Sequence, residues 1–314
     1  MMAVLALGAP VLYGRLHRTY EGMDGVTILV TGATGNVGRL VVDQLVKAGA
    51  SVRALTRDPG AAALPKGVEV AAGDLTRPSS LTEALDGVDR MYLFPVAETA
   101  REVVDLAKRA GVRRIVVLSS GAVTTGYDTD FHLPVEQAVE ASGLEWTHVR
   151  PGEFALNKLW LWGPSIRAER VVRDPYPNAA GYLTHERDIA DVATIALLED
   201  GHVGRAYTLC GPALIDTREQ VRIIAEAVGE EIRFEQVTAD RARDIYRKQG
   251  GFAAANADFL LGFEDYSGVE TDPSDAHEKW EPEAPVEMPT AEPVTGRPAR
   301  TFAQWARDHA SDFR

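Results

Sequence analysis

A glycine-rich turn near the start of the chain is the feature that most constrains its fold. The segment from Gly32 to Gly38 follows a short β-branched and apolar run, residues 26–31, and it precedes apolar residues at helical spacing in 39–48. Glycines at such a point let the backbone turn tightly, and they let main-chain N–H groups approach phosphates at the positive end of the next helix. The order strand, glycine turn, helix therefore predicts a dinucleotide-binding site.

Predicted strands and helices alternate along the next part of the chain, with short connections between them. This alternation is typical of an α/β fold with a doubly wound parallel sheet of Rossmann type. The carboxyl ends of parallel strands meet at one edge of such a sheet, so the segments that end there should share one crevice. The predicted strands are 26–31, 51–55, 68–72, 90–94, 114–118 and 145–149, and helices are predicted at 39–48, from 81–85, at 98–110 and at 133–141.

The regular alternation weakens after Pro151, which divides the chain into two predicted regions. Residues 24–155 should form the dinucleotide-binding core and residues 156–314 a smaller substrate-binding region. The helix and strand of 184–210 should return to the core. Prolines recur from Pro273 to Pro298 and would interrupt a long helix, so residues 255–294 are expected to form an acidic loop or lid. The aromatic residues of this region, Phe259, Phe263, Tyr266 and Trp280, indicate that part of it packs as a lid. The remaining predictions are helices at 185–199, 218–228 and 301–308 and a strand at 206–209.

Charge and cysteine content exclude several classes of function. The net charge is −13, and residues 255–294 hold 11 Asp or Glu and one Lys, so the rest of the chain is close to neutral. No stripe of lysine or arginine exists, and nucleic acid is therefore not an expected partner. The single cysteine, Cys210, excludes a disulfide framework and a multi-cysteine metal site, so no metal is expected. It also fits a reducing, cytoplasmic setting.

Residues 1–23 are predicted to be an N-terminal extension. Its apolar run is too short to span a bilayer, and Arg15 and Arg18 follow that run, whereas a secretory signal places its positive charge first. No membrane partner is therefore expected. Two interpretations stay open: a flexible or partner-packed extension, or an upstream start codon with Met23 as the true beginning. The second is favoured because Met23 stands just before the first predicted strand.

Several motifs resemble one protein family. The spacing of TGATGNVG is similar to that of the extended and atypical short-chain dehydrogenase/reductases, and it differs from the Gly-x-Gly-x-x-Gly of classical dehydrogenases. The match extends over 26 to about 210 and implies an NAD(P) cofactor. Stretches that resemble the NmrA-like branch are RALTRDP from Arg53, GDLTRPSSL from Gly73, VVLSS from Val116, SGLEWTHVRPGEFALN from Ser142 and TFAQWARDH from Thr301.

The end of the second predicted strand favours NADP(H) over NAD(H). NAD-selective proteins usually place Asp or Glu there, whereas this chain has Thr56-Arg57-Asp58. A guanidinium can bind the 2′-phosphate of NADP, although Asp58 weakly favours NAD(H) as the alternative. The turn and the resemblance together give the cofactor-binding candidates: Gly32, Thr34, Gly35, Asn36, Val37, Gly38, Arg57, then Asp74 and Leu75 for adenine, Phe94 and Pro95 for ribose, Ser119 for the nicotinamide ribose, and Pro151, Glu153 and Phe154 for the carboxamide end.

The usual catalytic pair of short-chain reductases is replaced. Tyr-x-x-x-Lys should lie at the start of the helix after Ser119, but His132 and Glu136 occupy its two positions. An imidazole suits proton transfer near neutrality, so His132 is one candidate for the proton donor or for orienting the substrate. The other candidates for the proton donor are Ser120, Tyr127, water or a ribose hydroxyl. These donors suit quinones and conjugated ketones, because the anion left by hydride transfer to such acceptors is delocalised. A structural hydrogen bond is the competing role for His132.

Two functions follow from these observations. The favoured one is NADP(H)-dependent reduction of a hydrophobic small molecule, an aromatic or polyketide-like ketone or a quinone, in a pocket that includes Trp160 and Trp162. Both tryptophans are equally compatible with a place in the core. The alternative is a non-catalytic NAD(P)-binding redox sensor or regulator, which some NmrA-like proteins are. A regulator is expected to lack a deep apolar cavity, and the sequence leaves the oligomeric state open.

Overall fold

The computed structural model describes residues 25–274 and 288–314. Residues 1–23, for which two interpretations stayed open, lie outside the described residues. The segment 275–287 of the acidic region, which includes Trp280, also lies outside them.

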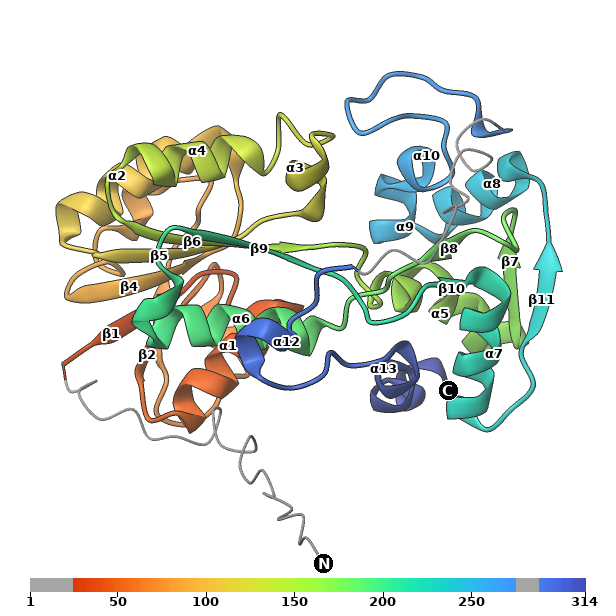
Figure 1. Ribbon diagram of the computed structural model, residues 1–314, viewed down its shortest axis with the longest axis horizontal. Coiled ribbons are helices and arrows are strands. Elements are labelled where there is room, and N and C mark those ends of the chain that lie inside the picture. The colour runs from red at the N-terminus through yellow and green to blue at the C-terminus, as the bar shows by residue number, and fades with distance from the viewer. Residues whose placement is uncertain (1–24, 275–287) are drawn as a thin grey trace, which may run out of the picture.

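One parallel sheet of seven strands forms the centre of the molecule and confirms the predicted α/β fold (Figure 1). The order β3-β2-β1-β4-β5-β6-β9 reverses direction beside β1, where doubly wound sheets bind their ligands. In this register Leu29 of β1 lies opposite Arg53 of β2 and Met91 of β4. The strands are β1 (Thr27–Val30), β2 (Ser51–Thr56), β3 (Glu69–Ala72), β4 (Val88–Leu93), β5 (Arg114–Leu118), β6 (Glu145–Pro151) and β9 (Arg205–Leu209).

Helices cover both faces of this sheet (Figure 1). On one face α1 (Asn36–Lys47) packs against α6 (Glu186–Leu198), and α12 (Glu292–Thr295) lies on α6. The other face carries α2 (Ala100–Ala110) and α4 (Leu133–Ala141), with the short α3 (Gly121–Thr125) near the edge. All five residues of β5 are buried, as expected for a strand covered on both faces.

Local differences from the sequence prediction have simple causes. The helix α1 begins at Asn36, three residues before the predicted start, because the end of the glycine turn is also the first turn of the helix. The helix predicted from 81–85 is wrong: Pro78–Leu81 forms a 3-10 turn (η3), and irregular turns follow up to Gly87. The φ of 68° at Gly87 ends this segment before a regular helix can form.

The remaining elements form a smaller part beside the sheet, with its own apolar core (Figure 1). The parallel pair β7–β11 and the antiparallel pair β8–β10 each make a small sheet. Residues 255–294 were expected to be a loop or lid, but their described part also contains α10 and most of α12. The elements are α5 (Asn157–Glu169), β7 (Val171–Asp174), β8 (Ala180–Gly181), β10 (Ile215–Asp216), α7 (Thr217–Val228), β11 (Arg233–Gln236), α8 (Ala239–Gln249), α9 (Gly251–Ala255), α10 (Ala257–Leu260) and α13 (Phe302–Asp308).

The described residues include no helix with the length and apolar character needed to cross a membrane.

Candidate functional site

The glycine turn is closed so tightly at Gly32 and Gly38 that other residues would not fit at these two positions. Gly32 has a φ of 59°, and its carbonyl accepts a hydrogen bond of 2.9 Å from the Gly35 N–H. A Cβ on Gly38 would lie 2.1 Å from the Gly32 oxygen. The glycines therefore let the first turn of α1 pack directly on the backbone of Gly32, and the N-terminus of α1 borders the turn, which suits a bound pyrophosphate.

A cavity of about 1320 Å³ runs from this turn into the C-terminal part of the molecule. Its first half follows the carboxyl ends of the parallel strands, as the strand order requires. The cofactor-binding candidates all line this one cavity: Gly32, Thr34, Gly35, Asn36, Val37, Gly38, Arg57, Asp74, Leu75, Phe94, Pro95, Ser119, Pro151, Glu153 and Phe154.

The residues after β2 place one positive and one negative group at the cavity. Arg57 is exposed and lines the cavity. Asp58 lines it too, but its carboxylate caps the next turn and accepts hydrogen bonds from the N–H groups of Gly60 (3.0 Å) and Ala61 (3.3 Å). One oxygen of Asp58 is thus used by its own turn, whereas the guanidinium of Arg57 makes no such contact with this turn, which favours the 2′-phosphate of NADP(H).

Ser119 belongs to a buried hydrogen-bonded group. Its hydroxyl donates to Oε1 of Glu136 at 2.5 Å, and the guanidinium of Arg150 binds both oxygens of Glu136 at 2.8 and 2.5 Å. Burial alone would raise the pKa of Glu136, but the hydrogen bonds from Arg150 and Ser119 outweigh it and hold the pKa below its usual range. Glu136 stands at the lysine position of the usual pair, and here it orients Ser119 instead of lowering the pKa of a phenol.

His132 is held by a buried carboxylate. Its Nδ1 lies 2.5 Å from Oδ2 of Asp128, whose Oδ1 accepts the backbone N–H groups of Phe131 and His132. Burial would raise the pKa of Asp128, but the hydrogen bonds from His132 and Phe131 lower it. The His132 ring lines the cavity, with the Phe131 ring packed against its edge at 4.7 Å. Only Nε2 is left to meet a ligand.

An ordered turn from the C-terminal part reaches this point. Asp265 Oδ1 accepts hydrogen bonds from Ser267 N, Ser267 Oγ and Val269 N, which fixes the turn with Tyr266 at its tip. Burial raises the pKa of the Tyr266 phenol, the nearby Asp128 carboxylate adds to the rise, and the Ser120 hydroxyl opposes it. Tyr266 therefore lies beside two residues of the loop after β5, and we call residues 257–274 the arm.

The other sequence candidates separate into two groups. Ser120, Trp160 and Trp162 line the cavity, and Trp162 is also part of the C-terminal apolar core. Tyr127 is not among the lining residues, and it is 71% exposed to solvent. The structure therefore brings His132 and Ser120 together in the cavity but leaves Tyr127 outside.

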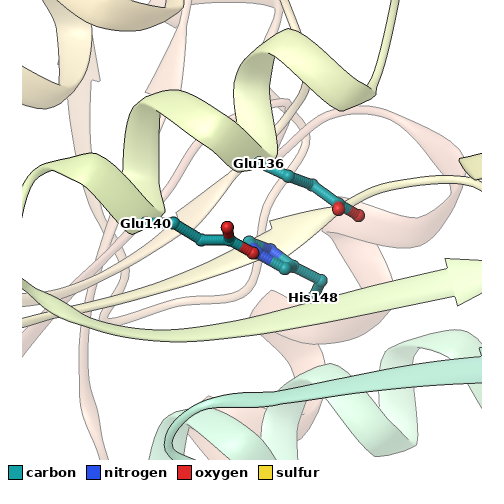
Figure 2. Close-up of side chains that lie close together, drawn as sticks. All are labelled: Glu136, Glu140 and His148. Atoms are coloured by element: carbon teal, nitrogen blue, oxygen red, sulfur yellow. The ribbon is translucent and has the colours of Figure 1, made fainter. Parts of the chain in front are cut away.

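Three side chains of metal-ligand type also lie close together (Figure 2). Glu136 and Glu140 are one turn apart on α4, and His148 of β6 places its Nε2 3.1 Å from Glu140. Both oxygens of Glu136 already accept hydrogen bonds from Arg150 and Ser119. Hydrogen bonds and ion pairs therefore account for this trio, and it supports Ser119 rather than forming a separate site.

Several residues of the cavity escaped the sequence analysis. Asp128 had a usable signal, because it lies four residues before His132. The others come from helices and loops far along the chain and carry no recognisable motif: Lys158, Asp174, Gln220, Tyr246 and Phe252. Phe259 and Tyr266, two of the aromatic residues expected to pack in part of the lid, also line the cavity.

Comparisons with known proteins agree with this geometry. The model of the NAD(P)H-binding family matches residues 32–200. The chain is 39% identical over 294 residues to the (4-alkanoyl-5-oxo-2,5-dihydrofuran-3-yl)methyl phosphate reductase of Streptomyces griseus, covering 91% of this chain and 99% of the relative. It is 33% identical over 307 residues to the NAD(P)H azoreductase of Xenophilus azovorans, with the same two coverages.

Solved structures show the same fold. The NADPH complex of the NADPH-dependent quinone oxidoreductase from Escherichia coli superposes with a TM-score of 0.71 at 24% identity, covering 90% of this chain and 99% of that chain. The glycine turn, the strand order and the matched length together show that the chain belongs to the NAD(P)H-binding family, in the NmrA-like branch of the atypical short-chain dehydrogenase/reductases.

Proposed function

We propose that this oxidoreductase reduces a flat, hydrophobic ketone or quinone and that the bound nicotinamide of NADPH supplies the hydride. Its relatives at 39% and 33% identity are both named as reductases. The finer assignment, an aromatic or polyketide-like acceptor, is supported by the aromatic residues beyond the predicted cofactor sites: Phe131, Trp160, Trp162, Phe252 and Phe259.

One observation carries the proposal: the cavity is continuous from the glycine turn to these aromatic side chains. A ligand among the aromatic residues would share one water-poor space with the cofactor-binding candidates. A regulator without turnover is expected to lack such a deep apolar cavity, so the cavity favours the enzyme over the redox sensor.

His132 is the best-placed proton donor in this proposal. The hydrogen bond to Asp128 holds the Nδ1–H and the orientation of the ring, and His132 lines the cavity. A neutral ring with its proton on Nδ1 has none on Nε2, so in this step the doubly protonated ring gives its Nε2 proton to the acceptor oxygen and keeps Nδ1–H on Asp128. Ser119 is less suited, because its proton is directed to Glu136. Ser120 and the Tyr266 phenol lie close by, and they can orient the acceptor oxygen by hydrogen bonding.

The first experiment is an assay of NADPH consumption against a panel of quinones and polycyclic ketones. We expect steady turnover with at least one member, since the aromatic side chains favour flat acceptors. Tight NADPH binding with no consumption by any member would rule out the enzyme and support the redox sensor.

The second experiment tests the proton donor with His132→Ala and Asp128→Asn. General acid catalysis contributes roughly 10²–10⁴-fold, so kcat for a simple aryl ketone should fall about 100-fold in His132→Ala and less in Asp128→Asn. NADPH affinity should be unchanged in both, which controls for folding. Unchanged kcat in His132→Ala would exclude this residue as the acid.

A further inference from the structure

The far end of the cavity holds buried polar side chains that the proposed chemistry does not use. They come from four elements of the C-terminal part: Lys158 and Trp162 from α5, Asp174 from the end of β7, Gln220 from α7 and Tyr246 from α8. All five line the cavity. We call them the polar end.

Two atoms of the polar end lack a well-formed hydrogen bond to the described residues. Trp162 and Gln220 are each 2% exposed, and neither the indole Nε1 nor the amide Oε1 has a partner in good hydrogen-bond geometry. The indole N–H nevertheless lies close enough to the Asp174 carboxyl and the Tyr246 phenol to lower the pKa of both. The other end of the Gln220 amide is fixed, because Nε2 donates to the Ile215 carbonyl at 2.9 Å. Leaving a buried polar group unpaired costs about 1–3 kcal/mol, so the Gln220 oxygen is an open acceptor for a ligand. The Trp162 N–H is a donor that a ligand can engage in better geometry than its contacts with Asp174 and Tyr246 have.

The electrostatics of the polar end disfavour an anion. Burial raises the pKa of Asp174 and Glu153 adds to the rise, whereas the Tyr176 backbone N–H, the Lys158 ammonium and the Trp162 N–H oppose it. The Lys158 ammonium is already paired with Glu153 at 2.8 Å and lies 4.9 Å from the centroid of the Trp162 ring. The carboxyl groups of Asp174 and Glu153 therefore face a single ammonium, that of Lys158, which is already paired with Glu153.

Tyr246 adds a neutral group to the same place. It is 3% exposed, and burial together with the neighbouring Asp174 raises its pKa, so it stays a protonated phenol at neutral pH. Trp162 and Tyr246 thus offer donors, and Asp174 and Gln220 offer acceptors. A group that both donates and accepts matches this set, whereas a carboxylate or phosphate only accepts.

We propose that the polar end binds a neutral hydroxyl or amide group of the substrate, with the aromatic body of that substrate packed along Trp160 and Phe252. These two rings lie 4.7 Å apart and wall the same cavity. The inference rests on the proposed function only in that the substrate occupies this cavity. It goes further by stating that the acceptor carries a neutral polar group and excludes an anionic one.

The test is calorimetric binding to the full chain in complex with NADP⁺, which allows no reduction of the probe. Naphthalene, 2-naphthol and 2-naphthoate share one ring system and differ in the polar group. At pH 7.5 we expect 2-naphthol to bind about 10-fold tighter than either of the others, the effect of about one good hydrogen bond. Equal or tighter binding of 2-naphthoate, or no binding of 2-naphthol, would overturn the proposal.

Variants assign the effect to the polar end. Trp162→Phe keeps the apolar ring and removes the N–H, so it should weaken 2-naphthol about 10-fold and leave naphthalene unchanged. Asp174→Asn removes the carboxyl group, and the affinity for 2-naphthoate should then come to within about 3-fold of the affinity for 2-naphthol. Trp146→Phe is the matched control, because Trp146 lies on β6, stacks on His148 and does not line the cavity.

A second variant and a folding control distinguish loss of the polar contact from loss of the fold. Tyr246→Phe is the second variant if Trp162→Phe does not fold, and NADP⁺ affinity reports folding in each case. Unchanged 2-naphthol affinity in every variant would mean that the polar end holds only water. Selective 2-naphthol binding without NADPH consumption toward any acceptor would refute the reduction and leave the polar end standing.

Discussion

Arg57 is the residue on which the choice between NADPH and NADH should depend. It lines the cavity after β2, while Asp58 is occupied by its own turn. Arg57→Ala should weaken NADPH by at least about 10-fold and NADH far less, because a hydrogen bond to a charged group contributes roughly 1.5–3 kcal/mol. Binding titrations with both cofactors measure this. Arg77→Ala is the control, since Arg77 is 75% exposed beside Asp74 and does not line the cavity. If Arg57→Ala weakened the binding of NADPH and of NADH equally, the NADP assignment would be refuted.

Glu136 should contribute to stability in a pH-dependent way. Its side chain is 1% exposed and pairs with Arg150, so Glu136→Gln should lower the free energy of unfolding by roughly 2–3 kcal/mol at pH 7. The folded pKa lies below the unfolded one, so this contribution is present above about pH 4.5 and is lost as pH falls.

Urea denaturation at pH 7 and pH 4 measures the difference between the Glu136→Gln variant and the parent chain. The difference in the free energy of unfolding between the two chains should be smaller at pH 4 than at pH 7. Glu140→Gln, on the exposed side of the same helix, should change stability by less than about 1 kcal/mol. If the stability difference between Glu136→Gln and the parent chain were equal at both pH values, the ion pair with Arg150 would not be what lowers the pKa of Glu136.

At the scale of elements, the arm depends on one carboxylate. Asp265→Ala removes three hydrogen bonds from the turn that presents Tyr266. We expect faster amide hydrogen exchange in 262–271 and a KM for the acceptor raised several-fold, with NADPH affinity unchanged, because the arm borders the aromatic side of the cavity.

A matched control for the arm is Asp272→Ala. Asp272 makes a similar turn with Ser274, further along the chain from Tyr266. If Asp272→Ala raised KM as much as Asp265→Ala, the position of Tyr266 would not be the cause.

The elements of the sheet were predictable, whereas the arm was predicted only as part of a loop or lid with packed aromatic residues. β5 (Arg114–Leu118) and α4 (Leu133–Ala141) match their predicted bounds because apolar runs, a glycine and short connections mark them locally. The same logic placed residues after successive strands into one crevice. Asp174, Tyr246 and Tyr266 reach the cavity only through packing between distant elements, and no local pattern encodes that packing. Asp128 was accessible through its spacing to His132 and was missed.

At the scale of the whole molecule, residues 288–314 join the two parts. Ala291 and Val294 belong to the apolar core beneath the sheet, whereas Phe302 and Trp305 are buried in the core of the C-terminal part. Arg300 lies between these contacts and pairs with Asp188 and Asp191 of α6. The segment therefore links the dinucleotide-binding side to the elements that wall the far end of the cavity.

Arg300→Ala should weaken this link and leave two carboxylates on α6 with less compensation. Because Arg300 keeps 25% exposure, we expect a loss of roughly 2–3 kcal/mol, below the cost for a fully buried pair. Burial already raises the pKa of Asp188 and Arg300 opposes the rise, so removing Arg300 raises that pKa further. A folded pKa above the unfolded one costs stability as pH increases, and the loss should therefore be larger at pH 7.5 than at pH 5.

Thermal unfolding of Arg300→Ala at both pH values, followed by tryptophan fluorescence and by NADPH binding, tests this prediction. In a Trp146→Phe background, which removes the tryptophan on β6, fluorescence reports the C-terminal part through Trp160, Trp162 and Trp305. NADPH reports the glycine turn, so separation of the two transitions would show that Arg300 couples the two parts. Arg307→Ala, an exposed position on α13 of the same segment, should leave both transitions together. A loss in Arg300→Ala that is larger at pH 5 would contradict the assignment, because protonation of Asp188 should relieve the uncompensated charge.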